Sequence, residues 1–329
     1  MSKKLINKPE TVVSDMLYGL AEANPDLVYI EGAEVISRRE KSGQVGVLSG
    51  GGAGHEPAHA GYVGEGMLDA AVSGNVFASP GPDRILEGIH RADSGKGVLL
   101  VVKNYSGDIM NFQMAAELAE MEGIQTRTVV VKDDVAVEDS LFSAGRRGIA
   151  GTVFVHKVAG AAAAAGKSLD EVADVAQKAI DRIRSMGMAS EPCTLPGALQ
   201  PNFQLADDEI EIGMGIHGEP GISKETMMPA QALAKRLLDC IFADKDYTGT
   251  ETAVLLNGLG GTPLMELYVM YHEVKKELEQ RGVTIWKALV GNYMTSLEMA
   301  GCSVTLMQLD EELKGYLSAP CNTPALKVL

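Results

Sequence analysis

Residues 50–59 read GGGAGHEPAH and directly follow Gln44–Leu48 (QVGVL), an apolar run that is typical of a buried strand. A strand that leads into a glycine-rich segment is the basic unit of an α/β fold that binds small ligands. The glycines permit close backbone approach to another group. With His55 and His59 in the same ten residues, this segment is a candidate site and predicts a pocket after a strand.

The same alternation of strand and helix recurs along the chain. Residues 97–103 (GVLLVVK) and 128–131 read as strands around a helical pattern from Phe112 to Gly123. A second series has strands at residues 210–214, 252–256, 283–290 and 303–309 and a helix at 230–241. The proline-containing segment 190–201 separates the two series. We predict two mixed α/β domains, residues 1–190 and 191–329, whose sheets are flanked by helices.

Composition limits the class of protein. The 329 residues are 46% hydrophobic and carry a formal net charge of −15, so a nucleic-acid partner is not expected without a basic patch. The N-terminus lacks an apolar signal region, and no stretch of about 18 apolar residues occurs. The four cysteines form no CxxC pair. We expect a cytoplasmic protein that neither spans nor binds a membrane.

The pattern His55-Glu56-x-x-His59 has the letters of a zinc-protease motif. Such a site needs both histidines one turn apart on the same helix. Pro57 suits the first turn of a helix, so we predict a helix that begins near Pro57 and leaves His55 outside it. His59 would then enter the helix and support the site. No metal site is predicted in this chain.

Two further patterns resemble nucleotide loops. Gly213–Gly218 matches GxGxxG after a strand, but Glu219-Pro220-Gly221 follows where a helix would have to begin. Residues 160–168 resemble a phosphate loop, but five consecutive alanines favour a helix. Ser168 and Glu171 then form a capping box for the next helix. The chain is therefore not expected to bind a nucleotide itself.

Polar residues follow three of the predicted strands. We expect the loops that carry His55, Asp108 and His217 to converge, because ligands of α/β sheets bind at the carboxyl ends of strands. The stretches around His55 and His217 also echo each other, as GHEP and HGEP. The remaining histidines outside residues 50–59, which we expect to be structural, are His90, His156 and His272.

Long segments of the chain resemble the substrate-binding subunit of dihydroxyacetone kinases, and this resemblance spans nearly the whole length. It is far more specific than the short patterns above. The segments that carry it are KLINKPETVV (4–13), LSGGGAGHEPAHAGYVGEGML (48–68), VVKNYSGDIMNF (101–112), DDVAVEDSLFSAGRRGIAGTV (133–153), GIHGEPG (215–221), NGLGGTPLMELY (257–268) and TSLEMAGCSVTL (295–306).

The resemblance implies a covalent mode of substrate binding. His217 would attack the ketone carbon of dihydroxyacetone and form a hemiaminal. His55 and Asp108 would act as acid and base, in an order that the sequence leaves open. The groups implied to hold the oxygens of the triose are Lys103, Gly52, Ala53 and Gly54.

The resemblance also implies a partner. Because this chain has no phosphate loop, the nucleotide (ADP or ATP) and magnesium are expected on a separate, DhaL-like nucleotide-binding subunit. In such split kinases the phosphotransferase system re-phosphorylates the nucleotide from phosphoenolpyruvate. We also expect a homodimer. Some family members carry a longer insertion near residues 242–252, so the docking of the partner is not settled by the resemblance.

Two alternatives remain open at this point. The first is a non-catalytic, ketose-sensing paralogue that acts as co-activator of a transcriptional regulator, because such paralogues can keep the attacking histidine. The second is a kinase subunit for another short ketose such as erythrulose. The joint presence of His55, Lys103, Asp108 and His217 favours the dihydroxyacetone kinase subunit.

Overall fold

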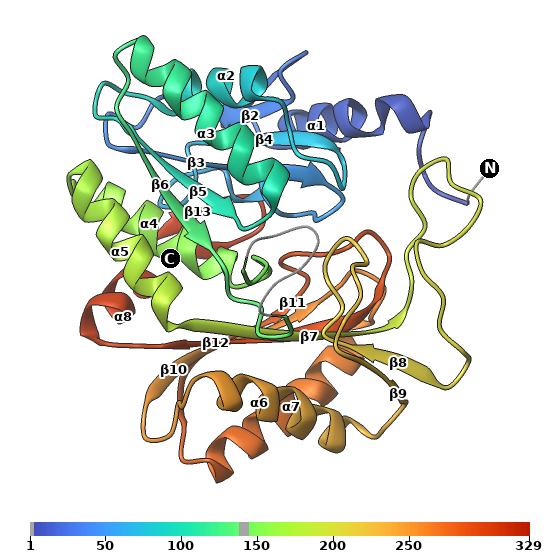
Figure 1. Cartoon of the computed structure of the whole chain (residues 1–329). Helices are drawn as coiled ribbons and strands as arrows, with labels where there is room; N and C mark the ends of the chain where they lie inside the picture. The colour runs from blue at the N-terminus through green and yellow to red at the C-terminus, as the bar shows by residue number, and fades with distance from the viewer. Residues whose placement is uncertain (1–2, 138–144) are drawn as a thin grey trace.

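The computed structural model describes residues 3–137 and 145–329. Two six-stranded sheets lie one above the other, with one layer of helices between them and helices on both outer faces (Figure 1). One of the segments that carry the family resemblance, residues 133–153, includes residues 138–144, which lie outside the described residues. The predicted class, mixed α/β sheets flanked by helices, is confirmed.

The first sheet has the order β1-β2-β4-β3-β5-β6. Strands β3 to β6 pair in parallel, whereas β1 and β2 add antiparallel strands at one edge. Helices α2 and α3 cover its outer face (Figure 1). The elements are η1 (Pro9–Thr11), α1 (Val12–Ala23), β1 (Leu27–Ile30), β2 (Val35–Arg38), β3 (Gly46–Ala53), η2 (Ala60–Tyr62), β4 (Ala70–Val76), α2 (Pro82–Ala92), β5 (Val98–Lys103), α3 (Ser106–Met121) and β6 (Thr126–Val131).

The second sheet has the order β11-β10-β12-β7-β8-β9 and is mainly antiparallel. Only β10 and β11 pair in parallel among the described strands of this sheet. Helices α6 and α7 cover its outer face (Figure 1). The elements are β7 (Ile183–Glu191), β8 (Glu209–Ile212), β9 (Ser223–Thr226), α6 (Ala230–Asp244), β10 (Glu251–Gly258), α7 (Leu264–Gln280), β11 (Thr284–Gly291) and β12 (Ala300–Gln308).

Strand β7 belongs to the second sheet although most of it precedes the predicted division at residue 190. The middle layer consists of α4 (Thr152–Ala164), α5 (Leu169–Arg182) and α8 (Glu311–Ser318), and one apolar core connects it to both sheets. The division into two independently folding domains, 1–190 and 191–329, stays a prediction. A short hairpin of β13 (Cys321–Asn322) and β14 (Lys327–Val328) ends the chain.

Strand β3 is longer than the apolar run predicted. It continues through the glycines to Ala53, because these glycines fit against neighbouring backbone. A Cβ on Gly50 would lie 2.5 Å from the carbonyl oxygen of Val72, and one on Gly52 would lie 2.6 Å from the amide nitrogen of Ala78. The glycine segment is therefore first a strand that packs closely against β4 and the loop after it.

Two other expectations need correction. No α-helix begins at Pro57: residues 55–59 form turns, and only the short 3-10 helix η2 follows. Helix α3 begins at Ser106, so Asp108 lies in the first turn of a helix and not in a loop. The spacing of apolar residues does not reveal this start, because Ser106 and Gly107 face a pocket instead of the core. A carboxylate in a first turn is favoured by the helix dipole.

Helix α4 is buried along almost its whole length, and it carries His156 into the core. His156 Nε2 lies 3.0 Å from Nδ1 of His59, and both side chains are buried. Burial, assisted by the charge of Lys103, lowers the pKa of His156 to about 3, and burial likewise holds the pKa of His59 well below its ordinary value. Both histidines are therefore neutral in the folded chain.

We expect this pair to make the fold acid-sensitive. Between pH 6.5 and about 3 the unfolded chain binds a proton at His156 that the folded chain excludes, so the free energy of unfolding falls as pH falls through this window. Each such proton contributes about 1.4 kcal/mol per pH unit. His156→Asn should make the decline shallower by about one proton, measured by denaturant unfolding at a series of pH values.

His272→Asn, at an exposed position on α7, is the control for removal of a histidine. An identical pH dependence in wild type and His156→Asn would contradict this account of the buried pair.

Candidate functional site

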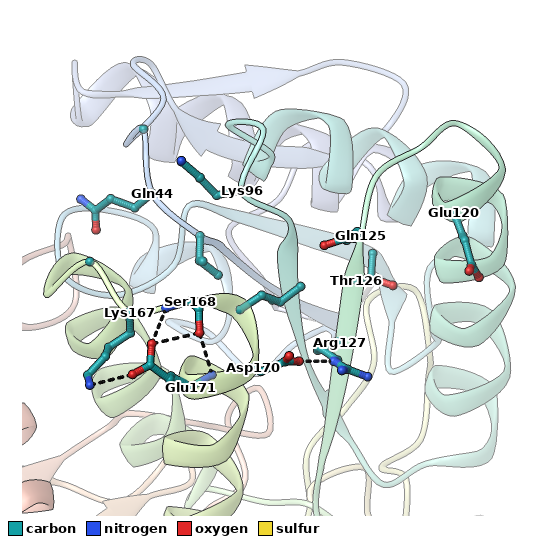
Figure 2. A pocket seen from close by; sticks show the side chains of 14 residues that line it. Gln44, Lys96, Glu120, Gln125, Thr126, Arg127, Lys167, Ser168, Asp170 and Glu171 are labelled. Atoms are coloured by element: carbon teal, nitrogen blue, oxygen red, sulfur yellow. Dashed lines mark hydrogen bonds and ion pairs between the residues drawn. The ribbon is translucent and has the colours of Figure 1, made fainter.

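A pocket of about 990 Å³ lies near the amino ends of β5 and β6, beside the start of α5 (Figure 2). Two of its three basic side chains already have carboxylate partners: Arg127 lies 2.6 Å from Asp170, and Lys167 lies 2.9 Å from Glu171. Ser168 and Glu171 form the predicted capping box, so the start of α5 is also satisfied. This pocket is thus at the end of the sheet opposite the predicted site.

A second pocket, of about 530 Å³, lies where the carboxyl ends of β3, β4 and β5 face the loop between β8 and β9. It brings together residues from both sheets, as expected for a ligand site at strand ends. Three of the predicted site residues line it. The lining residues are Gly52, Phe77, Ser79, Tyr105, Ser106, Gly107, Asp108, Leu195, His217, Gly218, Glu219 and Pro220.

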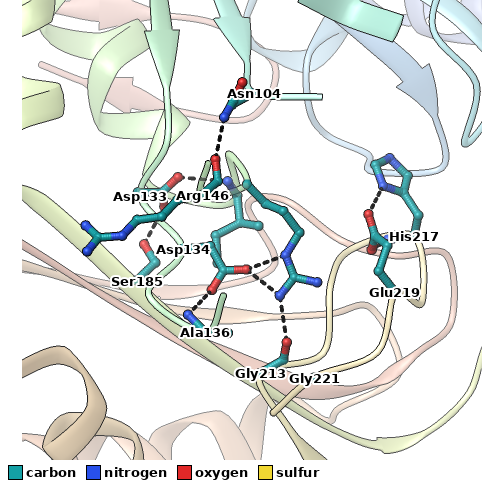
Figure 3. A network of polar contacts seen from close by, with 12 residues as sticks. Asn104, Asp133, Asp134, Ala136, Arg146, Ser185, Gly213, His217, Glu219 and Gly221 are labelled. Atoms are coloured by element: carbon teal, nitrogen blue, oxygen red, sulfur yellow. Dashed lines mark hydrogen bonds and ion pairs between the residues drawn. The ribbon is translucent and has the colours of Figure 1, made fainter. Parts of the chain in front are cut away.

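His217 is held by Glu219, two residues further along the same loop (Figure 3). Nδ1 of His217 lies 2.7 Å from Oε1 of Glu219, and the backbone N–H of His217 donates to Oε2 at 2.9 Å. An ionised carboxylate only accepts hydrogen bonds, so Nδ1 carries the proton. The other ring nitrogen, Nε2, therefore keeps its lone pair whenever the ring is neutral.

The echo between GHEP and HGEP has a structural counterpart. Glu56 accepts a hydrogen bond from the backbone N–H of Gly54 at 3.0 Å, just as Glu219 accepts one from the backbone N–H of His217. In both turns a buried carboxylate binds the amide two residues before it. Only Glu219 also binds a histidine ring, so only the ring of His217 is held by the carboxylate of its own turn.

Glu219 is ionised at neutral pH. Burial alone would raise the pKa of this carboxyl, but the hydrogen bond from His217 and the positive charges of His217 and Arg147 outweigh burial and lower the pKa to about 2. The charge of Arg147 is itself held in place by Asp134, whose Oδ2 lies 2.8 Å from Nε. Gly215 leaves room for this arrangement, because a Cβ there would lie 2.0 Å from Oε2 of Glu219.

Three rings surround the imidazole of His217. Tyr105, His55 and Phe77 contact it edge-on, with ring centroids 4.7, 4.8 and 5.4 Å away. The hydroxyl of Tyr105 is buried and has no hydrogen-bond partner among the described residues. The rings restrict rotation of His217.

His55 is completely buried, and its tautomer follows from its neighbour. Nδ1 donates to the backbone carbonyl of Thr295 at 2.8 Å, so a neutral His55 has its lone pair on Nε2. Burial first, then the charges of His217 and Lys103, hold the pKa of His55 well below its ordinary value. Nε2 has no partner within the described part of the chain. His55 is therefore an acceptor toward its surroundings.

Asp108 and Lys103 form a buried pair at the base of the pocket. Nζ of Lys103 lies 3.6 Å from Oδ2 of Asp108, which is an ion pair too long for a hydrogen bond. Oδ1 of Asp108 accepts a hydrogen bond from the hydroxyl of Ser79. Lys103 lies under Gly51, where a Cβ would be 2.7 Å from Nζ. Asp108 faces the pocket, and Lys103 stands behind it.

The glycine segment contributes less directly than predicted. Gly52 lines the pocket, but the amide of Gly54 is already bound by Glu56, and its carbonyl accepts from the backbone N–H of Leu297 at 2.7 Å. Ala53 pairs within the sheet. That Gly52, Ala53 and Gly54 hold substrate oxygens stays a prediction.

Sequence reasoning found His55, Asp108 and His217 but missed the groups that orient them. Glu219 had a signal, since it belongs to the echo noted in the sequence. Phe77, Ser79 and Tyr105 had none, because they follow β4 and β5 by one to three residues and become part of the site only through the fold.

The two patterns HExxH and GxGxxG are not on helices in the structure. His55 faces His217 and His59 faces His156, so these two histidines do not share a ligand. The GxGxxG stretch forms a loop between β8 and β9 with no helix after it. Within residues 3–137 and 145–329, no group of three or more metal-ligating side chains is found. No helix of this part is long and apolar enough to cross a bilayer.

The Dak1 domain family model matches residues 18–325. The chain belongs to the Dak1 domain family. It is 54% identical over 327 residues to the dihydroxyacetone-binding subunit DhaK of PTS-dependent dihydroxyacetone kinase 1 from Listeria innocua, which covers 98% of this chain and 99% of that protein. The resemblance inferred from the sequence is thereby confirmed.

Two solved structures are similar to this Dak1 chain. The dihydroxyacetone kinase of C. freundii superposes with a TM-score of 0.93 at 36% identity, covering 100% of this chain and 61% of that one. The dihydroxyacetone kinase operon co-activator Dha-DhaQ superposes with a TM-score of 0.89 at 38% identity, covering 94% of this chain and 96% of that one. Both a kinase and a co-activator therefore share this fold.

Removal of the Glu219 carboxylate should release the tautomer of His217. Glu219→Ala is expected to lower stability by about 1.5–3 kcal/mol, as for loss of a charge-assisted hydrogen bond. It should also move the ring proton from Nδ1 toward Nε2. Long-range ¹H–¹⁵N NMR of the histidine side chains measures the second effect, with Glu225→Ala as a surface-carboxylate control. An unchanged His217 signal would contradict the assigned role of Glu219.

Proposed function

We propose that this chain is the dihydroxyacetone-binding subunit of a phosphotransferase-system-dependent dihydroxyacetone kinase. It would hold the ketose as a covalent hemiaminal on Nε2 of His217 while a partner subunit phosphorylates the terminal hydroxyl. The observation that carries the proposal is the bond between His217 Nδ1 and Glu219, which leaves Nε2 as a nucleophile in a small polar pocket. The similarity to a DhaK subunit indicates that the ketose is dihydroxyacetone.

The covalent step uses ordinary carbonyl chemistry. Nε2 of His217 attacks the ketone carbon, a C–N bond forms, and the π electrons of the carbonyl move to its oxygen, which takes up a proton. The positive charge that develops on the ring lies against the Glu219 carboxylate. The oxygen takes its proton from water, and the Nδ1 proton leaves to water through the Glu219 carboxylate, so the adduct is neutral overall. Glycerol has no carbonyl and is excluded by this chemistry.

The orphaned polar groups beside His217 support a small polyhydroxyl ligand. Nε2 of His55 and the Tyr105 hydroxyl are buried without hydrogen-bond partners in the described chain. A buried polar atom without a partner lowers stability, so a ligand that forms these hydrogen bonds would be favoured. With Nδ1 bound to Thr295, the free Nε2 of His55 can accept a hydrogen bond from a ketose hydroxyl. Because His55 lies beside His217, we assign His55 to the hemiaminal and Asp108 to the phosphorylated end.

Asp108 is the proposed general base of phosphoryl transfer. It faces the pocket from the first turn of α3, and Ser79 and Lys103 orient its carboxylate. The covalent bond to His217 would fix the ketose so that its terminal hydroxyl meets the phosphoryl group in line. Asp108 then takes the hydroxyl proton as the phosphate arrives.

The nucleotide and its magnesium are proposed to reside on the partner subunit. Two observations support this: the GxGxxG loop leads into a turn, and the alanine-rich stretch at residues 160–164 is inside helix α4. Neither offers a set of free amides at a helix N-terminus to a phosphate group.

We further propose a cytoplasmic homodimer. All four cysteines are free thiols, which supports a reducing compartment. Strand β11 is an edge of the second sheet, and Leu264, Met265 and Tyr268 of the adjoining helix α7 are 54–75% exposed. An unprotected edge beside an apolar helix face suits a second copy of the chain. Sedimentation velocity of the wild type and of Met265→Glu tests this contact.

Loss of His217 should abolish the covalent adduct. With ketose labelled with ¹³C at the carbonyl carbon, wild type is expected to shift part of the ketone signal to the region of a tetrahedral carbon, and His217→Ala should show only free ketone. His272→Ala is the control at an exposed histidine. A tetrahedral signal that persists in His217→Ala would remove this residue from the covalent step.

Loss of the Asp108 carboxylate should separate binding from turnover. Asp108→Asn is expected to keep the ¹³C adduct but lower kcat by about 10²–10⁴-fold, the usual contribution of a general base. The measurement is triose phosphate formed with a nucleotide-loaded partner subunit. Asp83→Asn, on α2, controls for loss of an aspartate. Full turnover in Asp108→Asn would exclude the base role.

The co-activator fold match supports a second candidate, a ketose sensor. A sensor would show the adduct but yield no triose phosphate with its cognate nucleotide-binding subunit. The pocket of about 530 Å³ also leaves room for a four-carbon ketose. Competition between dihydroxyacetone and erythrulose for the adduct would rank the two.

A further inference from the structure

Helix α3 is apolar on two opposite sides. Phe112, Ala115 and Ala119 face the first sheet and are buried. On the other side, four large apolar side chains are exposed to between 40% and 84%. We call these four residues the α3 stripe: Met110, Met114, Leu118 and Met121. A surface helix usually has one apolar side that faces the core and a polar opposite side, so the exposed apolar stripe is a candidate contact surface.

The stripe is a single continuous surface. Spacings of four, four and three residues place its members on one side of a helix, over about 17 Å along the axis. In Figure 1 this helix lies on the outer side of the first sheet, with no other element drawn over it. A large exposed apolar surface of this kind marks an interaction site.

The stripe ends at the mouth of the candidate active site. Gly107 lies three residues before Met110, on the same side of α3, and it is exposed and lines the pocket together with Ser106. Asp108, between them and Met110, turns inward to the base of the pocket. A molecule that covers the stripe is therefore brought to the pocket opening.

We propose that the α3 stripe is the docking surface for the nucleotide-binding partner subunit. This inference rests on the proposed function. A phosphoryl donor must reach a hydroxyl beside Asp108 in line with its leaving group, so the donor subunit has to sit at the pocket mouth. A second copy of this chain at the same place would block the opening, which assigns the stripe to the partner and not to the homodimer.

The chemistry of the stripe fits a partner that binds and leaves in each cycle. Methionine side chains are flexible and polarizable, and they adapt to a surface that must form and release contacts repeatedly. Two exposed carboxylates, Glu117 and Glu120, lie on the same helix beside the stripe. The partner surface should accordingly combine an apolar centre with a basic rim, and the association rate should fall as salt rises.

Negative charge on the stripe should disrupt docking and leave the ketose site intact. The variant Met114→Glu/Met121→Glu avoids every pocket residue. Its matched control is Met227→Glu, which changes a methionine of 56% exposure that precedes α6 on the second sheet. Triose phosphate formation is measured against the concentration of partner subunit loaded with magnesium nucleotide, and the ¹³C adduct is measured without partner.

We expect the double variant to raise the KM for the partner subunit at least tenfold, with an unchanged adduct and with kcat recovered at high partner concentration. Met227→Glu should match wild type. An unchanged KM in the double variant would overturn the inference, as would an equal rise in Met227→Glu. Loss of self-association in the double variant, seen by sedimentation velocity, would assign the stripe to a second copy and also overturn it.

Failure of the proposed function gives a different result. In that case wild type itself shows no ketose adduct and forms no triose phosphate. Direct titration calorimetry of the partner subunit against wild type and the double variant then tests the surface without turnover. Equal affinities would overturn the docking inference, and a tenfold loss of affinity would support it.

Discussion

The backbone around His55 is hydrogen-bonded to the segment that follows β11, and the candidate site depends on this junction. The amides of Thr295 and Leu297 donate to the carbonyls of His55 and Gly54, and Nδ1 of His55 donates back to Thr295. The junction ties the first sheet to the second beside the pocket. It also fixes the tautomer of His55 and holds its ring 4.8 Å from that of His217.

The charged side chains next to His217 are buried, and they are held by one another and not by water. Asp134 holds Arg147, the positive charge of Arg147 helps to keep Glu219 ionised, and Glu219 orients His217. Asp134 is itself buried, and burial raises its pKa to about 6 despite the nearby arginine. A buried chain of charges of this kind fixes the orientation of the ring at its end, here the imidazole of His217.

The elements that sequence analysis located best are those whose apolar period is strong. Strands β5, β10 and β12 and helix α6 agree with the predicted ranges within a few residues. The errors lie where residues serve the pocket. The start of α3 was missed because Ser106 and Gly107 face solvent and ligand, and a helix was placed at Pro57 because proline suits a first turn whether or not a helix follows.

The sequence by itself determined the family and the mixed α/β class, and it singled out His55, Asp108 and His217 as candidate site residues, because long ordered motifs carry that information locally. Only the tertiary structure decided which ring nitrogen of each histidine is free, because Glu219 and Thr295 set the tautomers through the fold. It also decided that Lys103 stands behind Asp108, since burial depth depends on packing between strands that are far apart in the sequence.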